Sequence, residues 1–448
     1  MRNLKQNPFP GPIGLNGFQS IASTCREGAF LRLQSGLLDL RVTLVSVPTL
    51  GNALDFVLHY RTQNSATTTE LGHRWRHNYL MGLDITTSTT AVFTDASGVT
   101  YSYTKSGSTW SQSDGATLSA TLIEDTGNSE WRLEFLEGTK LTFKSFSGGG
   151  TLRRLEKIED KHQNATTLSY NGSGQLTTIT EPTGRTITLS YHATTGRLTT
   201  ITDPRSKSTS LTVDSNGHLT QITGPAGCTM TYTWDASHRI TKRTDPRSKD
   251  LHIEYKTGTD RVEKLRDHDH PTGSTYVNYV YDTVIEKTGR KYNTETPPTT
   301  PPSGVSQYQT RLDQTTVQLY DNGTKVSEWV VRFDESGNVW RIIDPLGRHT
   351  RCMWGAGGQL IYMSSGYPPS NAPNTTDRAY MEDCAQNAML SMAYDLDGNL
   401  ISTVDPNGLM TAMTYNDDKQ VTSVSPGLAH YGIQGNWSEH FGKDGWLL

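Results

Sequence analysis

Cysteine, charge and long apolar runs are all scarce in this chain of 448 residues. Its four cysteines lie far apart and form no Cys-x-x-Cys pair, which argues against a zinc centre and against a disulfide framework. No run of about 18 apolar residues occurs, so we expect no membrane-spanning helix. Charged residues make up 19% with a formal net charge of −4, a balance that favours neither nucleic acid nor an anionic membrane as a partner.

Two further absences concern export and catalysis. The N-terminus has a basic start but lacks the apolar stretch of a secretory signal peptide. No P-loop, His-Glu-x-x-His or Gly-x-Ser-x-Gly motif appears, so no common class of enzyme is indicated. Hydrophobic residues make up only 33%, and Thr, Ser, Gly and Asn fill the difference, which is typical of many short strands and turns.

The dominant feature is a unit that repeats through the second two-thirds of the sequence. One copy, YNGSGQLTTITEPTGRTITLS, runs from Tyr170 to the start of the next copy at Tyr191. Neighbouring copies begin 21 or 22 residues apart. The position of Tyr170 recurs at Val213, Trp234, Tyr255, Phe333, Trp354, Tyr394 and Tyr415. A fixed period of this length indicates a repeat architecture, in which most residues serve the shape and not a single catalytic site.

Each copy predicts two short strands and two tight turns. Ile187, Leu189 and Tyr191 alternate with polar residues, as in a strand with one buried face. Residues 344–347 and 405–408 read Asp-Pro-x-Gly, which matches a type I turn with Asp first, Pro second and Gly fourth. The second turn is predicted at residues 171–174, 214–217 and 395–398.

The repeats therefore predict an all-β fold in which one hairpin follows another. About 22 strands at a spacing of ~4.8 Å would make a sheet on the order of 100 Å wide. Twisted sheets of more than ~10 strands rarely stay open. We expect the repeated hairpins to coil into a spiral sheet or a partial barrel or shell, either hollow or collapsed on a filled core.

Composition and period divide the chain into segments. They are a flexible lead-in at 1–27, a strand-rich region without the period at 28–150, a repeat array at 151–285, a Pro-rich insertion at 286–315, a second repeat array at 316–426 and an irregular tail at 427–448. The second array is interrupted by an insertion at 363–392. The chain is thus predicted to be mainly one long array with two interruptions.

The two insertions differ in character. Pro297, Pro298, Pro301 and Pro302 are incompatible with a regular strand ladder, so residues 286–315 are predicted to be an extended surface excursion. Within 363–392 the stretch TTDRAYMEDCAQNAMLSM predicts one short helix, capped by Asn374 or by Thr375.

The copies resemble the YD repeats of the Rhs family. The dipeptides that carry this resemblance, beside the Gly-x-Leu and Asp-Pro-x-Gly-Arg elements, are Tyr170-Asn171, Tyr281-Asp282, Tyr320-Asp321, Tyr394-Asp395 and Tyr415-Asn416. The segment from Tyr60-Arg61-Thr62 through Gly72-His73-Arg74-Trp75-Arg76-His77-Asn78-Tyr79 is similar to the region that precedes the repeats in Rhs proteins. The resemblance covers roughly residues 30–425.

The resemblance implies a β-strand shell of the kind found in Rhs polymorphic toxins, Tc toxins and teneurins. We therefore expect a non-catalytic structural shell segment of a secreted or cell-surface polymorphic toxin, one that encapsulates or presents a C-terminal effector. Its partners would be that toxin domain or further Rhs segments. The alternative is a cell-surface adhesion module that binds carbohydrate or protein through Tyr and Trp on an open sheet face. Neither hypothesis needs a cofactor or a metal.

Family members also carry a C-terminal core segment that closes the shell and cleaves off the toxin by an internal aspartyl protease activity. No such segment is recognised in this sequence. Asp405-Pro406-Asn407-Gly408-Leu409 has the same superficial pattern, but it lies in register with the repeats. We therefore expect it to be an ordinary turn.

Two histidine-containing clusters are the most site-like groups in the sequence. Asp267-His268-Asp269-His270 offers oxygen and imidazole ligands for a metal, yet it also fits a variant of the Asp-Pro turn. His73, Arg74 and His77 beside Trp75 could form an acid–base or anion site. The family resemblance favours a structural role for this segment, with Trp75 and Tyr79 in the core.

The cysteines and paired carboxylates have similarly plain explanations. Cys352 occupies an apolar slot of a repeat and is predicted to be buried, and Cys228 follows a turn glycine and is predicted to be a partly exposed thiol. Cys384 has no partner in the sequence that would make it a nucleophile. The pairs Glu159-Asp160 and Asp417-Asp418 do not point to glycosidase chemistry. We predict no catalytic, cofactor-binding or metal-binding residue.

Overall fold

The structure is a computed structural model that describes residues 18–23, 27–49, 53–63, 68–113, 118, 120–136, 138–146, 148–287, 309–334, 337–354, 359–367, 389–395, 399–405, 409–416 and 421–429. Every regular element within these residues is a β-strand, which confirms the all-β prediction. The chain divides into two compact units, one built mainly from Leu37–Thr272 and the other mainly from Gly273–Leu448. Within the described residues, no helix is long and apolar enough to cross a membrane.

The N-terminal part of the chain forms a five-stranded sheet of order β1-β2-β3-β4-β7, here called the N-terminal sheet. Its strands are β1 (Phe18–Ser23), β2 (Glu27–Arg32), β3 (Leu37–Val47), β4 (Leu54–Arg61) and β7 (Trp75–His77). Between β4 and β7 the chain makes a two-stranded hairpin, here called the short hairpin, from β5 (Thr68–Thr69) and β6 (Gly72–His73).

A meander without the repeat period follows in the first unit. Its strands are β8 (Gly82–Thr87), β9 (Thr90–Thr94), β10 (Thr100–Ser106), β11 (Thr109–Gln112), β12 (Ala120–Asp125), β13 (Glu130–Phe135) and β14 (Lys140–Lys144). β8 pairs antiparallel with both β9 and β15. The meander is thereby joined edge to edge with the repeats.

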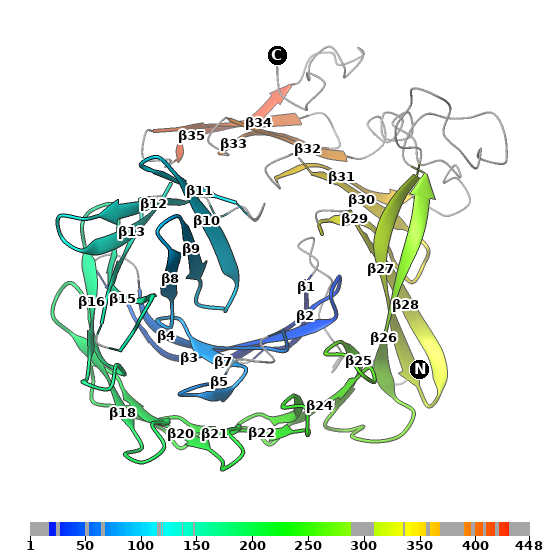
Figure 1. Cartoon of the computed structure of the whole chain (residues 1–448). Coiled ribbons are helices and arrows are strands. Elements are labelled where there is room, and N and C mark those ends of the chain that lie inside the picture. Colours follow the sequence, from blue (N-terminus) through cyan, green and yellow to red (C-terminus); the bar gives the residue numbers. More distant parts are fainter. Residues whose placement is uncertain are drawn as a thin grey trace. The chain divides into compact units, whose positions relative to one another are not determined.

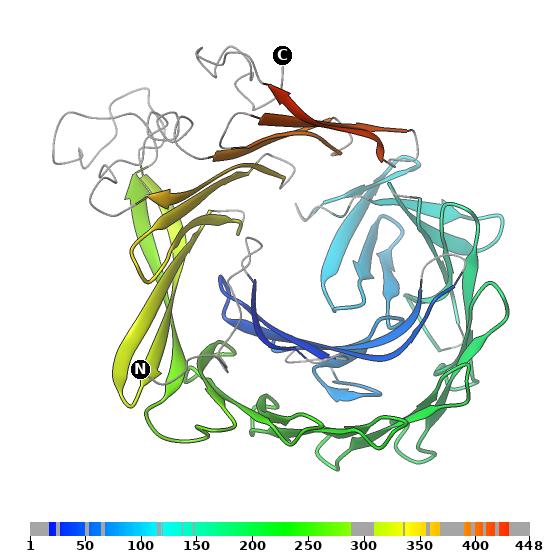
Figure 2. The same cartoon turned by 180° about the vertical axis from the view of Figure 1, so that it is seen from behind.

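The repeats of the first unit form one continuous antiparallel ladder. Its strands are β15 (Leu152–Glu159), β16 (Ala165–Tyr170), β17 (Leu176–Thr180), β18 (Thr186–Tyr191), β19 (Leu198–Thr202), β20 (Ser208–Val213), β21 (Leu219–Thr223), β22 (Thr229–Trp234), β23 (Ile240–Thr244), β24 (Asp250–Tyr255) and β25 (Val262–Asp267). Figure 1 shows this ladder, mostly green, curving around β3, β4 and β7 of the N-terminal sheet, and Figure 2 shows the same arrangement from behind.

The turns have the predicted type I geometry with a left-handed residue in the fourth position. In the turn at 203–207, Ser206 donates its backbone N–H to the Asp203 carbonyl at 2.9 Å and has a φ of 60°. Asp203 Oδ1 accepts the backbone N–H groups of Arg205 at 2.8 Å and Lys207 at 2.9 Å. Glycine usually fills the left-handed position, as Gly184 and Gly347 do, because it lacks the Cβ that this backbone crowds.

A second regular interaction joins successive copies through the aromatic residue that begins each one. Tyr191 donates its hydroxyl proton to the Leu176 carbonyl at 2.8 Å, and Tyr255 donates to the Ile240 carbonyl at the same distance. In both cases the acceptor lies 15 residues earlier, at the start of the previous copy's first strand. We call this series of bonds the aromatic ladder.

The aromatic ladder explains which residues can replace tyrosine. Trp234 and Trp354 occupy the same slot and donate through Nε1 at 3.0 and 2.8 Å. Tyr394 bonds to the Leu360 carbonyl at 3.0 Å even though 34 residues separate them, because an insertion lies between the two. The bond therefore follows the geometry of the sheet and not the count along the chain. Valine and phenylalanine have no side-chain donor, so the ladder is interrupted at Val213 and at Phe333.

The N-terminal sheet covers the apolar face of the repeats in the first unit. Trp75 packs edge-on to Tyr232 at 5.5 Å between ring centroids, and Tyr60 packs edge-on to Trp234 at 5.7 Å. The Tyr60 hydroxyl accepts the backbone N–H of Ile240 at 3.1 Å, and burial raises the pKa of Tyr60 to about 12. The repeat residues buried on this face include Leu176, Ile179, Leu198, Ile201, Leu219 and Ile222, all at most 4% exposed. The inner face is thus a filled core and not a cavity.

The second unit is also an antiparallel ladder, in which each strand pairs with the next along the chain. Its strands are β26 (Tyr276–Lys287), β27 (Gln309–Asp321), β28 (Thr324–Phe333), β29 (Val339–Ile343), β30 (His349–Trp354), β31 (Leu360–Tyr367), β32 (Met389–Tyr394), β33 (Leu400–Val404), β34 (Leu409–Tyr415) and β35 (Val421–Ala429). Two of its strand pairs span the predicted insertions.

Both insertions are shorter than predicted. Residues 286–287 and 309–315 belong to the long β26–β27 pair, so the ladder extends into the segment assigned as an excursion. Likewise 363–367 and 389–392 are strand residues, so the C-terminal end of the predicted helix is wrong: it pairs with β31 instead. Residues 288–308 and 368–388, with Pro297 to Pro302 and the rest of the helix prediction, lie outside the described residues.

The aromatic ladder makes a prediction about stability. Tyr191→Phe removes one hydroxyl and leaves the Leu176 carbonyl without its donor, so we expect the free energy of unfolding to fall by about 1 kcal/mol. Tyr191→Trp keeps a hydrogen-bond donor in the slot, as at Trp234. Its free energy of unfolding should therefore fall less than that of Tyr191→Phe. Urea unfolding of the three proteins measures the difference, and equal midpoints for the Phe and Trp variants would contradict the ladder.

Candidate functional site

The interruption of the aromatic ladder at Val213 is the place where the short hairpin contacts the repeats. His73 donates its backbone N–H to the Gly217 carbonyl at 2.8 Å, and Leu198 donates its N–H to the Glu70 carbonyl at 3.0 Å. A Cβ atom on Gly72 would lie 2.3 Å from the Gly217 oxygen and 3.4 Å from Val213 Cγ1. The hairpin backbone thus lies close to Val213, where other copies have an aromatic ring.

A second set of contacts links some Gly-x-Leu turns to the next turn through the middle residue. Gln175 Nε2 donates to the Gly196 carbonyl at 3.1 Å, and the Arg239 guanidinium donates to the Thr259 carbonyl. His218 occupies this middle position in its own copy. Its Nε2 lies 2.8 Å from His238 Nδ1 in the next copy's turn. This contact bridges two turns, as its counterparts do.

Three histidines meet at this point, one from the short hairpin and two from the repeats. The rings of His73 and His238 stack with centroids 3.8 Å apart and planes 12° apart. His218 lies 5.7 Å from His73 and stacks on Trp234 at 4.9 Å. Partial burial, followed by the nearby His238 and His218, lowers the pKa of His73. These surroundings therefore favour the neutral form of the His73 imidazole.

His238 holds an unusual backbone conformation. Its φ is 58°, in the left-handed region that Gly174 and Gly217 occupy at the same turn position of other copies. A non-glycine residue in this region costs on the order of 1 kcal/mol. The histidine is therefore retained against a conformational preference, and its side chain is placed beside His73 and His218 by that turn.

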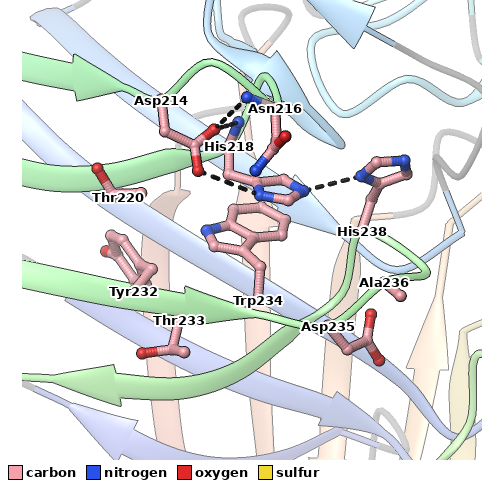
Figure 3. A pocket seen from close by; sticks show the side chains of 10 residues that line it. All are labelled: Asp214, Asn216, His218, Thr220, Tyr232, Thr233, Trp234, Asp235, Ala236 and His238. Atoms are coloured by element: carbon pink, nitrogen blue, oxygen red, sulfur yellow. Dashed lines mark hydrogen bonds and ion pairs between the residues drawn. The ribbon is translucent and has the colours of Figure 1, made fainter.

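An open pocket of about 620 Å³ borders the cluster (Figure 3). Its wall consists of Asp214, Asn216, His218, Thr220, Tyr232, Thr233, Trp234, Asp235, Ala236 and His238. Asp214 Oδ1 accepts the backbone N–H groups of Asn216 and His218 at 2.9 and 2.8 Å, and Oδ2 lies 3.5 Å from His218 Nδ1. Asp235 Oδ2 pairs with Arg239 at 2.8 Å.

The pocket is poorly suited to the acid–base or sugar-binding chemistry that its residue types first suggest. Both carboxylates are engaged in their own turns. One face of the Trp234 indole is already stacked against His218, and Tyr60 contacts the ring edge-on. A sugar-binding platform needs an uncovered aromatic face. What remains is a group of imidazoles whose contacts depend on their protonation state.

Of His73, Arg74 and His77, only His73 stacks on a residue of the pocket wall, His238. Arg74 is buried and pairs with Asp260 at 3.2 Å, and it donates to the Ser237 carbonyl at 3.0 Å. His77 is buried too, and its Nε2 donates to Glu70 at 2.9 Å because its Nδ1 accepts the Tyr79 N–H. Burial alone would raise the pKa of Glu70, but the hydrogen bond from His77, the electrostatic attraction of His77 and the charge of Arg76 together lower that pKa.

Trp75 and Tyr79 are buried, as expected for core residues. Together with the ion pairs of Arg74 and His77, this gives the segment a structural role in the described residues. The acid–base hypothesis for His73, Arg74 and His77 as one group is not supported, because the three side chains have different partners.

The Asp267-His268-Asp269-His270 cluster is spread along a surface turn. His270 Nδ1 lies 2.9 Å from Asp267 Oδ1, whereas His268 Nδ1 accepts the Asp250 N–H at 3.4 Å. Asp269 lies 3.8 Å from the Lys249 ammonium. Across the residues that the structure describes, no three His, Cys, Asp or Glu side chains are grouped so that they could hold a metal ion.

The cysteine predictions are confirmed where the structure describes them. Cys352 is fully buried, and burial raises the pKa of its thiol to about 12. Cys228 is exposed. Cys384 lies outside the described residues.

The carboxylate pairs likewise serve turns where they are described. Asp160 Oδ1 accepts the backbone N–H groups of His162 and Asn164, both at 2.9 Å, and Glu159 pairs with Lys157. Asp405 Oδ1 accepts the Leu409 N–H at 2.9 Å, as in the other turns. Asp417 and Asp418, and residues 406–408, lie outside the described residues.

Sequence reasoning missed His218 and His238 altogether. The signal was present in the repeat alignment, where His218 stands in the position of Gln175 and His238 in the position of Gly174. Each is a departure from the other copies, but only the structure shows that the two departures meet each other and His73.

Comparison with known proteins identifies the repeats. The family described as RHS Repeat matches residues 170–208, 213–249 and 394–427, and a domain of unknown function, DUF6531, matches residues 33–103. No curated protein sequence matches the chain.

Several solved structures are weakly similar. The crystal structure of TcdB2-TccC3-Cdc42 is 11% identical with a TM-score of 0.34, over 91% of this chain and 21% of that one. The TcdB2-TccC3 crystal structure is 12% identical with a TM-score of 0.27, over 92% and 27%. A Photorhabdus luminescens Tc holotoxin pore is 12% identical with a TM-score of 0.26, over 91% and 24%. The chain thus spans little more than a quarter of these proteins at most, and scores this low carry no argument.

The gap at Val213 yields a prediction. Val213→Tyr would place a ring where the Gly72 backbone lies, so we expect overpacking to lower the free energy of unfolding by about 1–3 kcal/mol. Val213→Ile, which adds one methylene, is the matched control. Urea unfolding measures both. An unchanged or higher midpoint for Val213→Tyr would mean that tyrosine completes the ladder without displacing the short hairpin.

Proposed function

Because this chain is a member of the Rhs-repeat proteins, we propose that it is a non-catalytic wall segment of a shell that encloses or presents a C-terminal effector. The protein would act in a secreted or cell-surface toxin. Its partners would be the effector or further Rhs segments. No step of this role requires chemistry from the chain itself.

The observation that carries this proposal is a difference in burial between copies of the same repeat. The residues opposite the ladder aromatic and three positions later are buried in the first unit, as Leu198 and Ile201 are at 0% exposure. In the last copy the equivalent residues are Val421 and Val424, at 51% and 55% exposure. In the second unit the copy that begins at Phe333 has these slots buried too, at Val339 and Ile342, so the open slots are those of the last copy.

The uncovered slots are apolar and regularly spaced. Val421 pairs with Tyr415 across the bulge as Leu198 pairs with Tyr191, so the two strands present the same face. Leaving two valines half exposed forgoes about half of the roughly 1.5–3 kcal/mol that full burial of each such side chain contributes. In the first unit a sheet of the same chain supplies the cover. We infer that another polypeptide segment supplies it at the last copy, where Val421 and Val424 are exposed.

This function predicts that charge in the open slots will release the covered segment. Val421→Lys with Val424→Lys, made in the native polypeptide that contains this chain, should abolish protease protection of the effector or the following segment. Val326→Lys is the matched control, because Val326 is also 55% exposed but lies on a strand outside these slots. Limited proteolysis read by mass spectrometry measures the protection.

Two results would count against the proposal. Protection that survives both lysines would show that the slots do not contact the enclosed segment. If no segment is protected in the unmodified protein, and the protein instead retains a glycan or a cell-surface protein, then the adhesion alternative takes its place.

A further inference from the structure

The contact between the short hairpin and the repeats includes a few polar interactions beside the buried Leu71. Its backbone bonds are those of His73 to Gly217 and of Leu198 to Glu70. The Arg197 guanidinium adds a bond to the Thr69 carbonyl. His73 also stacks on His238, Gly72 lies against Gly217 and Val213, and Leu71 is fully buried. Three imidazoles therefore lie at the point where this hairpin is held.

The fold does not require histidine at these positions. A glutamine fills the His218 position in the copy that begins at Tyr170, and it still bridges to the next turn. Glycine fills the His238 position in other copies, at Gly174, Gly217 and Gly337, without the strain of a left-handed histidine. Two neighbouring departures from the repeat, both toward histidine and both facing a third histidine, indicate a property that the repeat itself lacks.

Protonation is incompatible with the observed arrangement of these rings. At 2.8 Å, one of the two facing nitrogens of His218 and His238 must donate and the other must accept. When both rings are imidazolium, each nitrogen carries a proton and the bond is lost. A charged His73 stacked at 3.8 Å on a charged His238 adds repulsion between like charges.

The charged groups around the cluster offset this repulsion only in part. Asp214 Oδ2 lies 3.5 Å from His218 Nδ1. Three other carboxylates already have cationic or imidazole partners: Asp235 with Arg239, Asp260 with Arg74, and Glu70 with His77. Arg197 lowers the pKa of His73 further, after burial, His238 and His218. Thr68 Oγ1 lies 3.1 Å from His73 Nδ1 and carries no charge.

We propose that the three histidines are an acid-sensitive latch, which holds the short hairpin on the repeats while they are neutral and releases it when they are protonated. A histidine whose folded-state pKa is lowered stabilises the closed contact fully above its ordinary pKa of about 6.5. That stabilisation is lost as the pH falls toward the lowered value. Release breaks the hydrogen bonds of the Leu198 N–H and the Gly217 carbonyl to the short hairpin. It also opens the space beside Val213.

Amide hydrogen exchange of the intact protein tests the latch directly. The His73 and Leu198 amides are bonded across the contact, so their protection reports closure. We expect protection of peptides spanning these amides to fall about tenfold or more between pH 7.5 and about 5, a range that brackets the ordinary histidine pKa. Amides of the β17–β18 pair serve as the reference for the intrinsic pH dependence of exchange.

The decisive comparison uses replacements taken from the repeat itself. In His218→Gln with His238→Gly, His73 is the only imidazole left, so the acid-induced loss of protection should shrink to about twofold or less. His162→Gln, in an exposed turn, is the matched control and should behave like the unmodified protein. Unchanged protection of the β17–β18 amides shows that each variant is folded.

The same double variant also distinguishes the latch from a second acid-sensitive group, His59. Burial, with Arg41 next, lowers the pKa of His59 on β4 to about 4, so acid also destabilises the N-terminal sheet. That effect persists in the double variant and appears in β4 peptides. The latch is overturned if the unmodified protein keeps its short-hairpin protection in acid, or if the double variant loses as much protection as the unmodified protein.

Discussion

The bond from each aromatic side chain to a backbone carbonyl one hairpin earlier is the constraint on which the rest of the repeat sheet depends. It sets how far apart two copies lie, because the ring must reach the carbonyl at the start of the previous strand pair. A bulge also falls beside this position in copy after copy, including the copies that begin at Val213 and Phe333 and lack the bond. A single bond of this kind is worth about 1 kcal/mol, but its repetition fixes one register for the sheet.

The same constraint gives meaning to a copy that lacks the bond. Val213 leaves room for Gly72, and the short hairpin there makes two backbone bonds with the repeats. Aromatic contacts of Tyr60 and Trp75 then join the N-terminal sheet to the next copy. The inner face of the first unit is filled in this way, whereas Val421 and Val424 in the second unit remain open.

The repeat was readable from the sequence because its signals are local. Strand alternation, the Asp-Pro-x-Gly turn and the buried position of Cys352 all depend on residues within one copy. The helix ending at Met392 was wrong at its C-terminal end, since pairing with β31 overrides the local helical preference there. The histidine cluster could not be predicted, because His73 is 145 residues from His218 in the sequence (218 − 73) and only tertiary packing brings them together.

A double-mutant cycle on Gly72→Ala and Val213→Tyr tests the central claim most directly, since both changes compete for the same volume. Once either change has displaced the short hairpin, the other should cost little. The account therefore predicts that the double variant loses less unfolding free energy than the sum of the two single-variant losses. The difference should be about 1 kcal/mol or more. Additivity within about 0.5 kcal/mol would contradict it, because independent sites behave in that way.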